Sequence, residues 1–170
     1  AYDADRLRLA PIHERLQRAG VRNIQVKDPA TSSLDDLVDQ MDLVFIDAPC
    51  TGTGVWRRRP DSKWKLAEKA LQDRIEDQRR VLESASRYVK PGGRLAYATC
   101  SVLREENQAQ ADWFLEQNPS FQSVSALDIW KTTLPDARLP KYVSDRGDIL
   151  LTPGSTQTDG FFIALFRRVQ

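Results

Sequence analysis

The stretch "LVFIDAPCTGTG", residues 43–54, joins the clearest strand pattern of the chain to one of its two cysteines. Its first four residues are all apolar, which is typical of a strand buried on both faces of a parallel sheet. The proline and the two glycines that follow are typical of a loop that leaves such a strand. Because ligands in open α/β sheets bind beyond the carboxyl ends of the strands, this loop is the first candidate for a functional site.

The second cysteine also follows a predicted strand, "RLAYAT", residues 94–99. Between the two strands, from Lys65 to Val89, apolar residues recur at intervals of three and four, which predicts a long amphipathic helix. A strand–helix–strand unit of this kind places two parallel strands side by side. We therefore expect Cys50 and Cys100 to face one another across a single crevice.

The rest of the chain continues the alternation of helix and strand. The expected elements are a helix over 10–19, a strand over 23–26, a helix capped by Asp28, a helix over 105–117, and two antiparallel strands within 148–153 and 160–168. Residues 120–146 show no clean period. The pattern predicts one domain over residues 1–170, an α/β layer sandwich with a mainly parallel sheet and an antiparallel C-terminal strand.

The composition excludes several classes of protein. With 25 basic and 24 acidic residues, any surface for a polyanion must be local. Two cysteines and one histidine are too few for a structural zinc site or a disulfide framework, so we expect no metal. The chain contains no apolar stretch of about 18 residues, so we expect no membrane partner. The chain fits a soluble, cytoplasmic protein from a reducing compartment.

Simpler explanations of the two cysteine loops exist. The thiols are interpretable as small apolar side chains, or as a pair able to oxidise. "CTGTG", residues 50–54, suggests a phosphate loop, but it lacks the Gly-Lys-Ser/Thr ending and the third glycine of the nucleotide-binding motifs. Both thiols come just past strand ends rather than inside strands, which favours paired thiol chemistry.

Three segments carry a resemblance to a known family: "FIDAPCTGTGVWRRRPDSKWKL" (45–66), "VKPGGRLAYATCSVLREEN" (89–107) and "DGFFIALFRR" (159–168). They resemble the RsmB/Sun (Fmu) family of S-adenosylmethionine-dependent RNA cytosine-5 methyltransferases, and the match runs essentially from residue 1 to residue 168. The resemblance implies a Rossmann-like class I methyltransferase domain and an RNA substrate, with ribosomal RNA as the expected species.

The resemblance also implies different catalytic roles for the two thiols. Cys100, in the Thr-Cys-Ser motif, would be the nucleophile that adds to carbon 6 of cytosine, and Cys50 would help release the product. Addition needs a thiolate, and a free thiol with a pKa near 8.5 is only a few per cent ionised at about pH 7. The chemistry alone leaves open which thiol attacks, and only the family match orders them.

Three acids match the family's pattern for S-adenosylmethionine. Asp3 would bind the ribose hydroxyls, Asp28 would lie by the adenine, and Asp47 would lie near the methionine part and the target base. Asp3 and Asp28 are equally interpretable as helix caps, and the two roles do not exclude each other.

The stretch "WRRRPDSKWK", residues 56–65, combines five basic residues with two tryptophans beside the Cys50 loop. A run of charge is usually a solvated face. Arginines next to aromatic rings are, however, what stacking and phosphate contacts with unpaired RNA require. We therefore expect RNA contacts from Arg57, Arg58, Lys63 and Trp64, and the resemblance adds Pro60 and Asp61 as residues that shape the substrate side.

The chain departs from the family at its beginning. Nothing in it matches the strand and glycine-rich loop that hold the methionine end of the cofactor. We therefore expect an incomplete cofactor site, exposed strand edges and a tendency to self-associate. A non-catalytic RNA-binding domain of the same descent, an inactive fragment, and a methyltransferase acting on an amino nitrogen, which would not need two thiols, remain as alternatives.

Overall fold

The computed structural model describes all 170 residues and divides into two compact units, Ala1–Val38 and Asp39–Gln170. Each unit is described by itself. The chain has no helix that combines the length and the apolar character needed to span a bilayer.

The first unit is built from short elements, α1 (Arg6–Leu9), α2 (Ile12–Arg18) and the 3-10 turn η1 (Asp35–Leu37). α2 lies within the helix predicted over 10–19. The strand predicted over 23–26 does not form. Instead, the amino group of Ala1 donates to the Gln25 carbonyl and the Lys27 amide donates to the Ala1 carbonyl, which is the bonding pattern of one step of a parallel ladder.

The helix predicted to start after Asp28 is also wrong. The Asp28 carboxylate accepts a hydrogen bond from the Ala30 amide at 2.9 Å, and the Asp28 carbonyl accepts from the amides of Thr31 and Ser32. This is a local turn that closes on itself, since an aspartate side chain bonded two residues ahead favours a turn as readily as a helix start.

The second unit contains one six-stranded sheet. Its elements are β1 (Met41–Asp47), η2 (Thr53–Val55), α3 (Asp61–Trp64), α4 (Glu68–Ser86), β2 (Val89–Thr99), η3 (Arg104–Glu106), α5 (Gln108–Gln117), β3 (Phe121–Val124), α6 (Ala126–Thr133), β4 (Tyr142–Val143), β5 (Ile149–Leu151), α7 (Pro153–Thr156) and β6 (Phe161–Arg168). The strand order is β1-β2-β6-β5-β4, and β3 pairs with β6.

The mixed α/β fold with an antiparallel C-terminal strand is confirmed. β1 and β2 are parallel, joined through α4, whereas β6 runs antiparallel to each of its three partners, β2, β3 and β5. Within this chain, parallel pairing is therefore confined to β1–β2. The connections fit this pairing: β4, β5 and β6 follow one another through short links, which suit antiparallel pairs, whereas the long β1–β2 link contains α4 and forms a parallel crossover.

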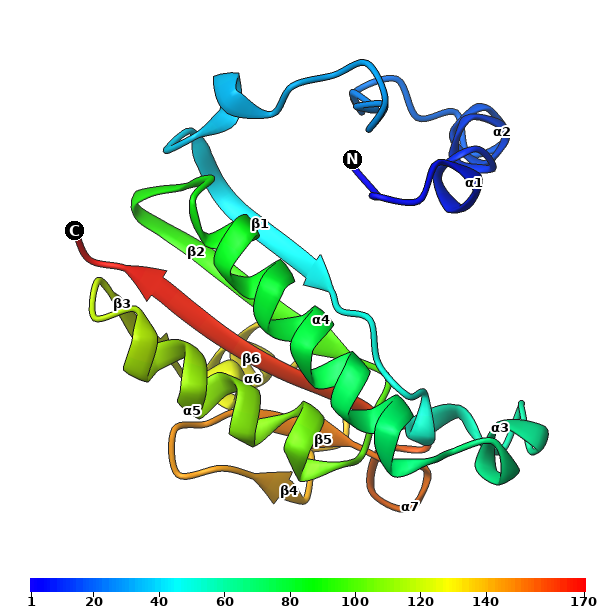
Figure 1. Cartoon of the computed structure of the whole chain (residues 1–170). Helices are drawn as coiled ribbons and strands as arrows, with labels where there is room; N and C mark the ends of the chain where they lie inside the picture. Colours follow the sequence, from blue (N-terminus) through cyan, green and yellow to red (C-terminus); the bar gives the residue numbers. More distant parts are fainter. The chain divides into compact units, whose positions relative to one another are not determined.

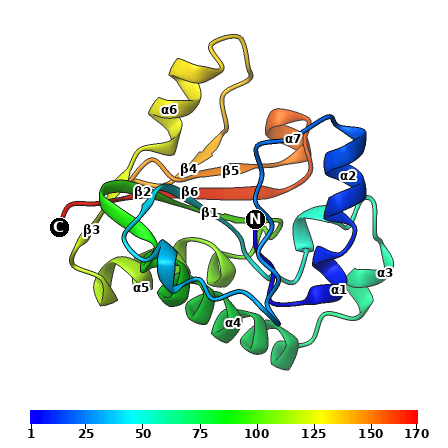
Figure 2. The same cartoon turned by 90° about the horizontal axis from the view of Figure 1, so that it is seen from above.

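Helices cover both faces of the sheet. α4 and α5 lie on one face and α6 lies on the other, as Figures 1 and 2 show from two directions. The larger core lies under α4 and α5, and its fully buried aromatic and leucine side chains are Tyr97, Phe114, Phe162, Phe166, Leu82 and Leu95. The smaller core lies under α6 and includes Ala126, Ile149 and Leu151.

One face of β1 is exposed, although the sequence predicted burial on both. Ile46 and Val44 pack into the core beneath α4, whereas Leu43 is 55% exposed and Phe45 is 66% exposed. The side chains of successive strand residues point to opposite faces, and in this unit only the α4 side of β1 is covered. β1 is also the last strand of the sheet, so its outer edge is unpaired.

Candidate active site

Cys50 and Cys100 both lie past the carboxyl ends of the paired parallel strands, as the sequence predicted. β1 ends at Asp47, which is in register with Ala98, one residue before the end of β2. The sulfur atoms of Cys50 and Cys100 are 3.3 Å apart, both half-buried and both free thiols. The expectation that the two thiols face each other is therefore met in the structure.

The close contact shifts the pKa values of the two thiols in opposite directions. The hydrogen bond from Cys50 lowers the pKa of the Cys100 thiol to about 7, although burial and the nearby carboxylates of Asp47 and Glu106 oppose this. The same hydrogen bond raises the pKa of the Cys50 thiol, and deeper burial raises it further. At pH 7 about half of Cys100 is therefore ionised, and Cys50 donates a hydrogen bond to that thiolate.

Two glycines hold the loops against each other. The Gly54 amide donates to the Cys100 carbonyl, and the Gly160 amide donates to the Gly54 carbonyl, each at 2.9 Å. A Cβ on Gly54 would lie 2.3 Å from the Gly160 carbonyl oxygen, so only glycine allows this approach. The loop that leaves β1 is thereby tied both to Cys100 and to the segment before β6.

Thr51 and Pro49, the neighbours of Cys50, are held by two buried side chains that the sequence analysis did not single out. The Glu106 carboxylate accepts hydrogen bonds from the Thr51 amide at 2.8 Å and from the Thr51 hydroxyl at 2.5 Å. Gln78 of α4 donates to the Pro49 carbonyl at 2.8 Å and to Glu106 at 3.2 Å. The sequence did contain one indication of the role of Gln78, because this polar residue occupies a position in the apolar period of α4, and that position is buried.

The neighbours of Cys100 are held in a similar way by Asn107, which was also missed. The Thr99 hydroxyl donates to the Asn107 side-chain oxygen at 2.6 Å, and the Asn107 amide group donates to the Ser101 carbonyl at 2.9 Å. Ser101 is linked in turn to the hydroxyl of Thr53 at 2.9 Å. The two cysteine loops therefore form a single hydrogen-bonded assembly.

The three candidate cofactor acids fall in different units. Asp47 is exposed at the end of β1, and its carboxylate makes no hydrogen bond or ion pair. In the first unit, Asp3 accepts a hydrogen bond from the Asp5 amide at 2.8 Å, and Asp28 forms an ion pair with Arg6 at 3.4 Å. No cluster of histidine, cysteine or acidic side chains is arranged to hold a metal ion.

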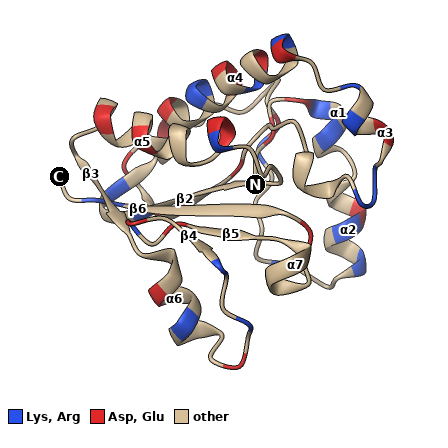
Figure 3. Cartoon of the chain, turned by 90° about the horizontal axis from the view of Figure 1, so that it is seen from below, with Lys and Arg blue, Asp and Glu red and all other residues tan.

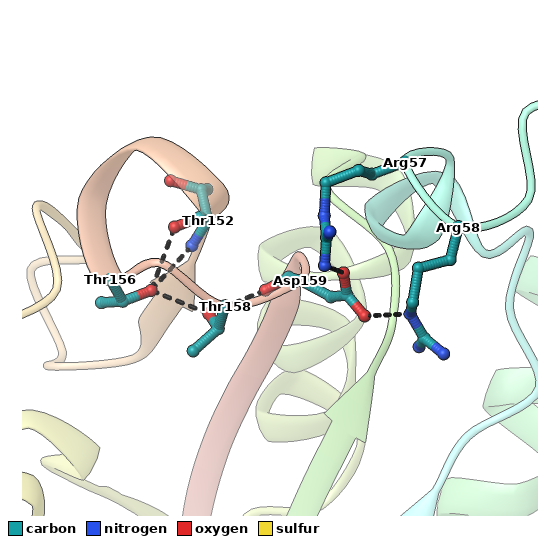
Figure 4. A network of polar contacts seen from close by, with 6 residues as sticks. All are labelled: Arg57, Arg58, Thr152, Thr156, Thr158 and Asp159. Atoms are coloured by element: carbon teal, nitrogen blue, oxygen red, sulfur yellow. Dashed lines mark hydrogen bonds and ion pairs between the residues drawn. The ribbon is translucent and has the colours of Figure 1, made fainter.

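Arg57 and Arg58, two of the predicted RNA-binding residues, converge on Asp159. Arg57 forms an ion pair with Asp159 at 3.2 Å and Arg58 forms one at 2.5 Å, while both arginine side chains remain more than half exposed. Figure 4 shows Asp159 between the arginines and the threonine cluster around α7. Burial disfavours the Asp159 charge, but the hydrogen bonds from Arg58 and Arg57 outweigh this and lower the pKa of that carboxyl.

Lys63 and Trp64 lie in α3, in the same segment. The Lys63 ammonium lies 5.9 Å from the centre of the Trp56 ring and 5.6 Å from that of Trp64, within the range of cation–π contacts. Trp64 itself is 82% exposed. A large aromatic side chain left this open beside cationic groups is available to stack on a flat partner.

Charge elsewhere is mixed in sign. Figure 3 shows acidic and basic positions interleaved along α4, while the central strands are mostly uncharged. A cationic surface beside the thiols therefore depends on the local segment that contains Arg57, Arg58 and Lys63.

Comparisons with known proteins match nearly the whole chain. The family model described as 16S rRNA methyltransferase RsmB/F matches residues 1–167. A relative from Sodalis glossinidius, named ribosomal RNA small subunit methyltransferase B, is 37% identical over 96% of this chain and 35% of its own length. The chain thus spans about a third of the curated relatives that it matches.

Solved structures show the same likeness. The crystal structure of PH0851 superposes with a TM-score of 0.83 at 34% identity, covering 99% of this chain and 36% of that one. A methyltransferase homologue from Pyrococcus horikoshii gives a TM-score of 0.67 at 30% identity, covering 99% of this chain and 52% of its own. With its sequence matched almost end to end and its thiols at the ligand edge of the sheet, the chain belongs to the RsmB/F family of rRNA methyltransferases.

Proposed function

We propose that this chain is the catalytic part of an S-adenosylmethionine-dependent methyltransferase that modifies carbon 5 of a cytosine in ribosomal RNA. The observation that carries the proposal is the 3.3 Å contact between the Cys50 and Cys100 sulfur atoms, just past the carboxyl ends of β1 and β2. Residues 1–170 are proposed to act as a single methyltransferase domain.

The pKa values of the two thiols support Cys100 as the nucleophile. A pKa of about 7 keeps a large fraction of Cys100 as thiolate at neutral pH, ready to give an electron pair to carbon 6 of cytosine. Formation of the sulfur–carbon bond shifts electron density onto carbon 5. That carbon, which is a poor nucleophile in free cytosine, then becomes reactive enough to be methylated.

Cys50 is suited to the second half of the reaction. Two of the causes that raise its pKa, the hydrogen bond to Cys100 and the charge on Cys100, disappear once Cys100 is bonded to carbon 6. Cys50 then loses its proton to solvent more readily and accepts the proton from carbon 5. The sulfur–carbon bond breaks at the same time, and Cys100 is returned as the thiolate.

The acids fit the proposed cofactor. Asp47 has an unpaired, exposed carboxylate beside the thiols, and one carboxylate oxygen of Asp3 makes no hydrogen bond, so both are able to accept hydrogen bonds from a ligand. We propose Asp3 for the ribose hydroxyls, Asp28 for the region of the adenine and Asp47 for the methionine part. S-adenosylmethionine would supply the methyl group.

The segment of residues 56–65 supports an RNA substrate. Its exposed Trp64 offers a ring on which a base can stack, and Arg57, Arg58 and Lys63 offer cationic groups for phosphates. A non-catalytic RNA-binding domain would need this segment but would have no use for a thiolate with a thiol donor beside it.

The proposal is tested by methylating small-subunit ribosomal RNA with radiolabelled S-adenosylmethionine, digesting the RNA and identifying the labelled nucleoside by mass spectrometry. We expect label in 5-methylcytidine, and no label with the Cys100→Ser variant. Label on an amino nitrogen, or methylation that persists without Cys100, would contradict the thiol mechanism. RNA binding with no methyl transfer would favour the non-catalytic alternative.

A further inference from the structure

Glu106, the last residue of η3, and Asn107, which links η3 to α5, are consecutive in the chain, and both side chains are fully buried. A buried carboxylate is costly unless it is well bonded. Glu106 has no ion-pair partner, and its carboxylate is satisfied by hydrogen bonds from Thr51 and Gln78. The energetic cost of burying the Glu106 carboxylate therefore indicates a role for this side chain beyond packing.

Glu106 and Gln78 together fix both sides of Cys50. Glu106 binds the amide and the hydroxyl of Thr51, which follows Cys50. Gln78 binds the carbonyl of Pro49, which precedes it, while donating to Glu106. The Cys50 backbone is thus held between two anchored neighbours.

Asn107 does the same for Cys100, through Thr99 before it and Ser101 after it. Asn107 also stands at the N-cap position of α5, where an asparagine side chain ordinarily bonds the helix backbone. Here it makes no such capping bond. The side chain serves the loop rather than its own helix.

We propose that Glu106 and Asn107 are positioning residues that hold the two cysteine loops in register and so set the separation of the Cys50 and Cys100 sulfur atoms. Because the two residues are adjacent in the chain, a shift of one loop is transmitted to the other through a single peptide unit. The role rests on the proposed function, in which both thiols act on one base.

Two isosteric variants test the proposal without changing any charge. Thr51→Val removes the hydroxyl that binds Glu106, and Thr99→Val removes the hydroxyl that binds Asn107. The measurement is the rate at which iodoacetamide alkylates Cys100 in the full chain, followed by peptide mass spectrometry between about pH 5 and 10. We expect each variant to raise the midpoint of the pH profile by about one pH unit, because the hydrogen bond from Cys50 weakens as the sulfurs separate.

The Glu106→Gln variant tests the direction in which the midpoint of the alkylation profile shifts. Loss of the Glu106 charge alone would favour the Cys100 thiolate and lower the midpoint, since that carboxylate opposes ionisation of Cys100. Loss of positioning raises the midpoint instead, and this is the expected result. The matched control is Asp148→Asn, which removes another buried carboxylate, one bonded to Ser144 and Arg146, and should leave the midpoint unchanged.

The proposal is overturned if the threonine variants, shown to be folded by their thermal unfolding, keep the parent's midpoint or lower it. A shift of equal size in Asp148→Asn would also overturn it, because the effect would then be general. Alkylation needs neither RNA nor cofactor. A failure of methyl transfer in the parent chain would therefore count against the proposed function alone.

Discussion

At the scale of single residues, the site is governed by the contact between two thiols. A free cysteine ionises too weakly near neutral pH to be an efficient nucleophile, and no histidine, lysine or arginine accounts for the low pKa of Cys100. The donor is Cys50, so one thiol activates the other. The sequence placed both cysteines at the correct edge but gave no indication of the hydrogen bond, which depends on a loop geometry that Thr51 and Glu106 determine.

Replacing Cys50 with alanine should raise the pKa of the Cys100 thiol, because the hydrogen bond that lowers it is lost. If that pKa returns to the ordinary value near 8.5, the thiolate fraction at pH 7 falls by about 15-fold. Iodoacetamide alkylation of Cys100 at pH 7 should slow by that factor, whereas the rate well above pH 9 should match the parent. An unchanged rate at neutral pH would show that Cys50 is not the donor.

Replacing Gly54 with alanine should destabilise the protein, since the added Cβ would collide with the Gly160 carbonyl. We expect a loss of about 1–3 kcal/mol in the free energy of unfolding, measured by urea denaturation. Gly154→Ala in α7 is the matched control, because a Cβ there meets no atom within 4 Å. Equal losses in the two variants would contradict the tight approach of the loops.

At the scale of elements, long periodic segments were predictable and short ones were not. α4 and β6 are long enough for their apolar pattern to stand out, and both were expected close to where they lie. β3 and β4, only four and two residues long, exist because β6 and β5 offer them a partner. A pattern of that length carries no usable period, since partners distant in the sequence determine whether the strand forms.

α3 and the residues before it provide the test of RNA binding. Replacing Trp64 with alanine should weaken binding of single-stranded RNA by about 1–3 kcal/mol, the usual value of one base stacked on an aromatic ring. Fluorescence anisotropy with a labelled oligonucleotide measures this. Tyr142→Ala removes another aromatic side chain, 57% exposed in β4, and should not change the affinity. If the two variants behave alike, α3 is a solvated face rather than an RNA-binding element.

At the scale of the whole molecule, the unpaired edge of β1 and the exposed Leu43 and Phe45 beside it favour association. Sedimentation velocity of the chain should show species larger than a monomer that grow with concentration. Phe45→Lys should shift the distribution toward the monomer. Leu7→Lys changes an apolar residue of α1 that is even more exposed than Phe45, and it should have no effect. A monomer at all concentrations would contradict this prediction.

The central claim is that Cys100 bonds covalently to a cytosine and that Cys50 is needed to release it. The most direct measurement is the intact mass of the Cys50→Ala variant after incubation with S-adenosylmethionine and small-subunit ribosomal RNA, under denaturing conditions that leave only covalent complexes. The account predicts a protein–RNA adduct that accumulates in Cys50→Ala and disappears when Cys100 is also replaced by alanine. No adduct in Cys50→Ala while the parent methylates the same RNA, or an adduct that survives loss of Cys100, would contradict it.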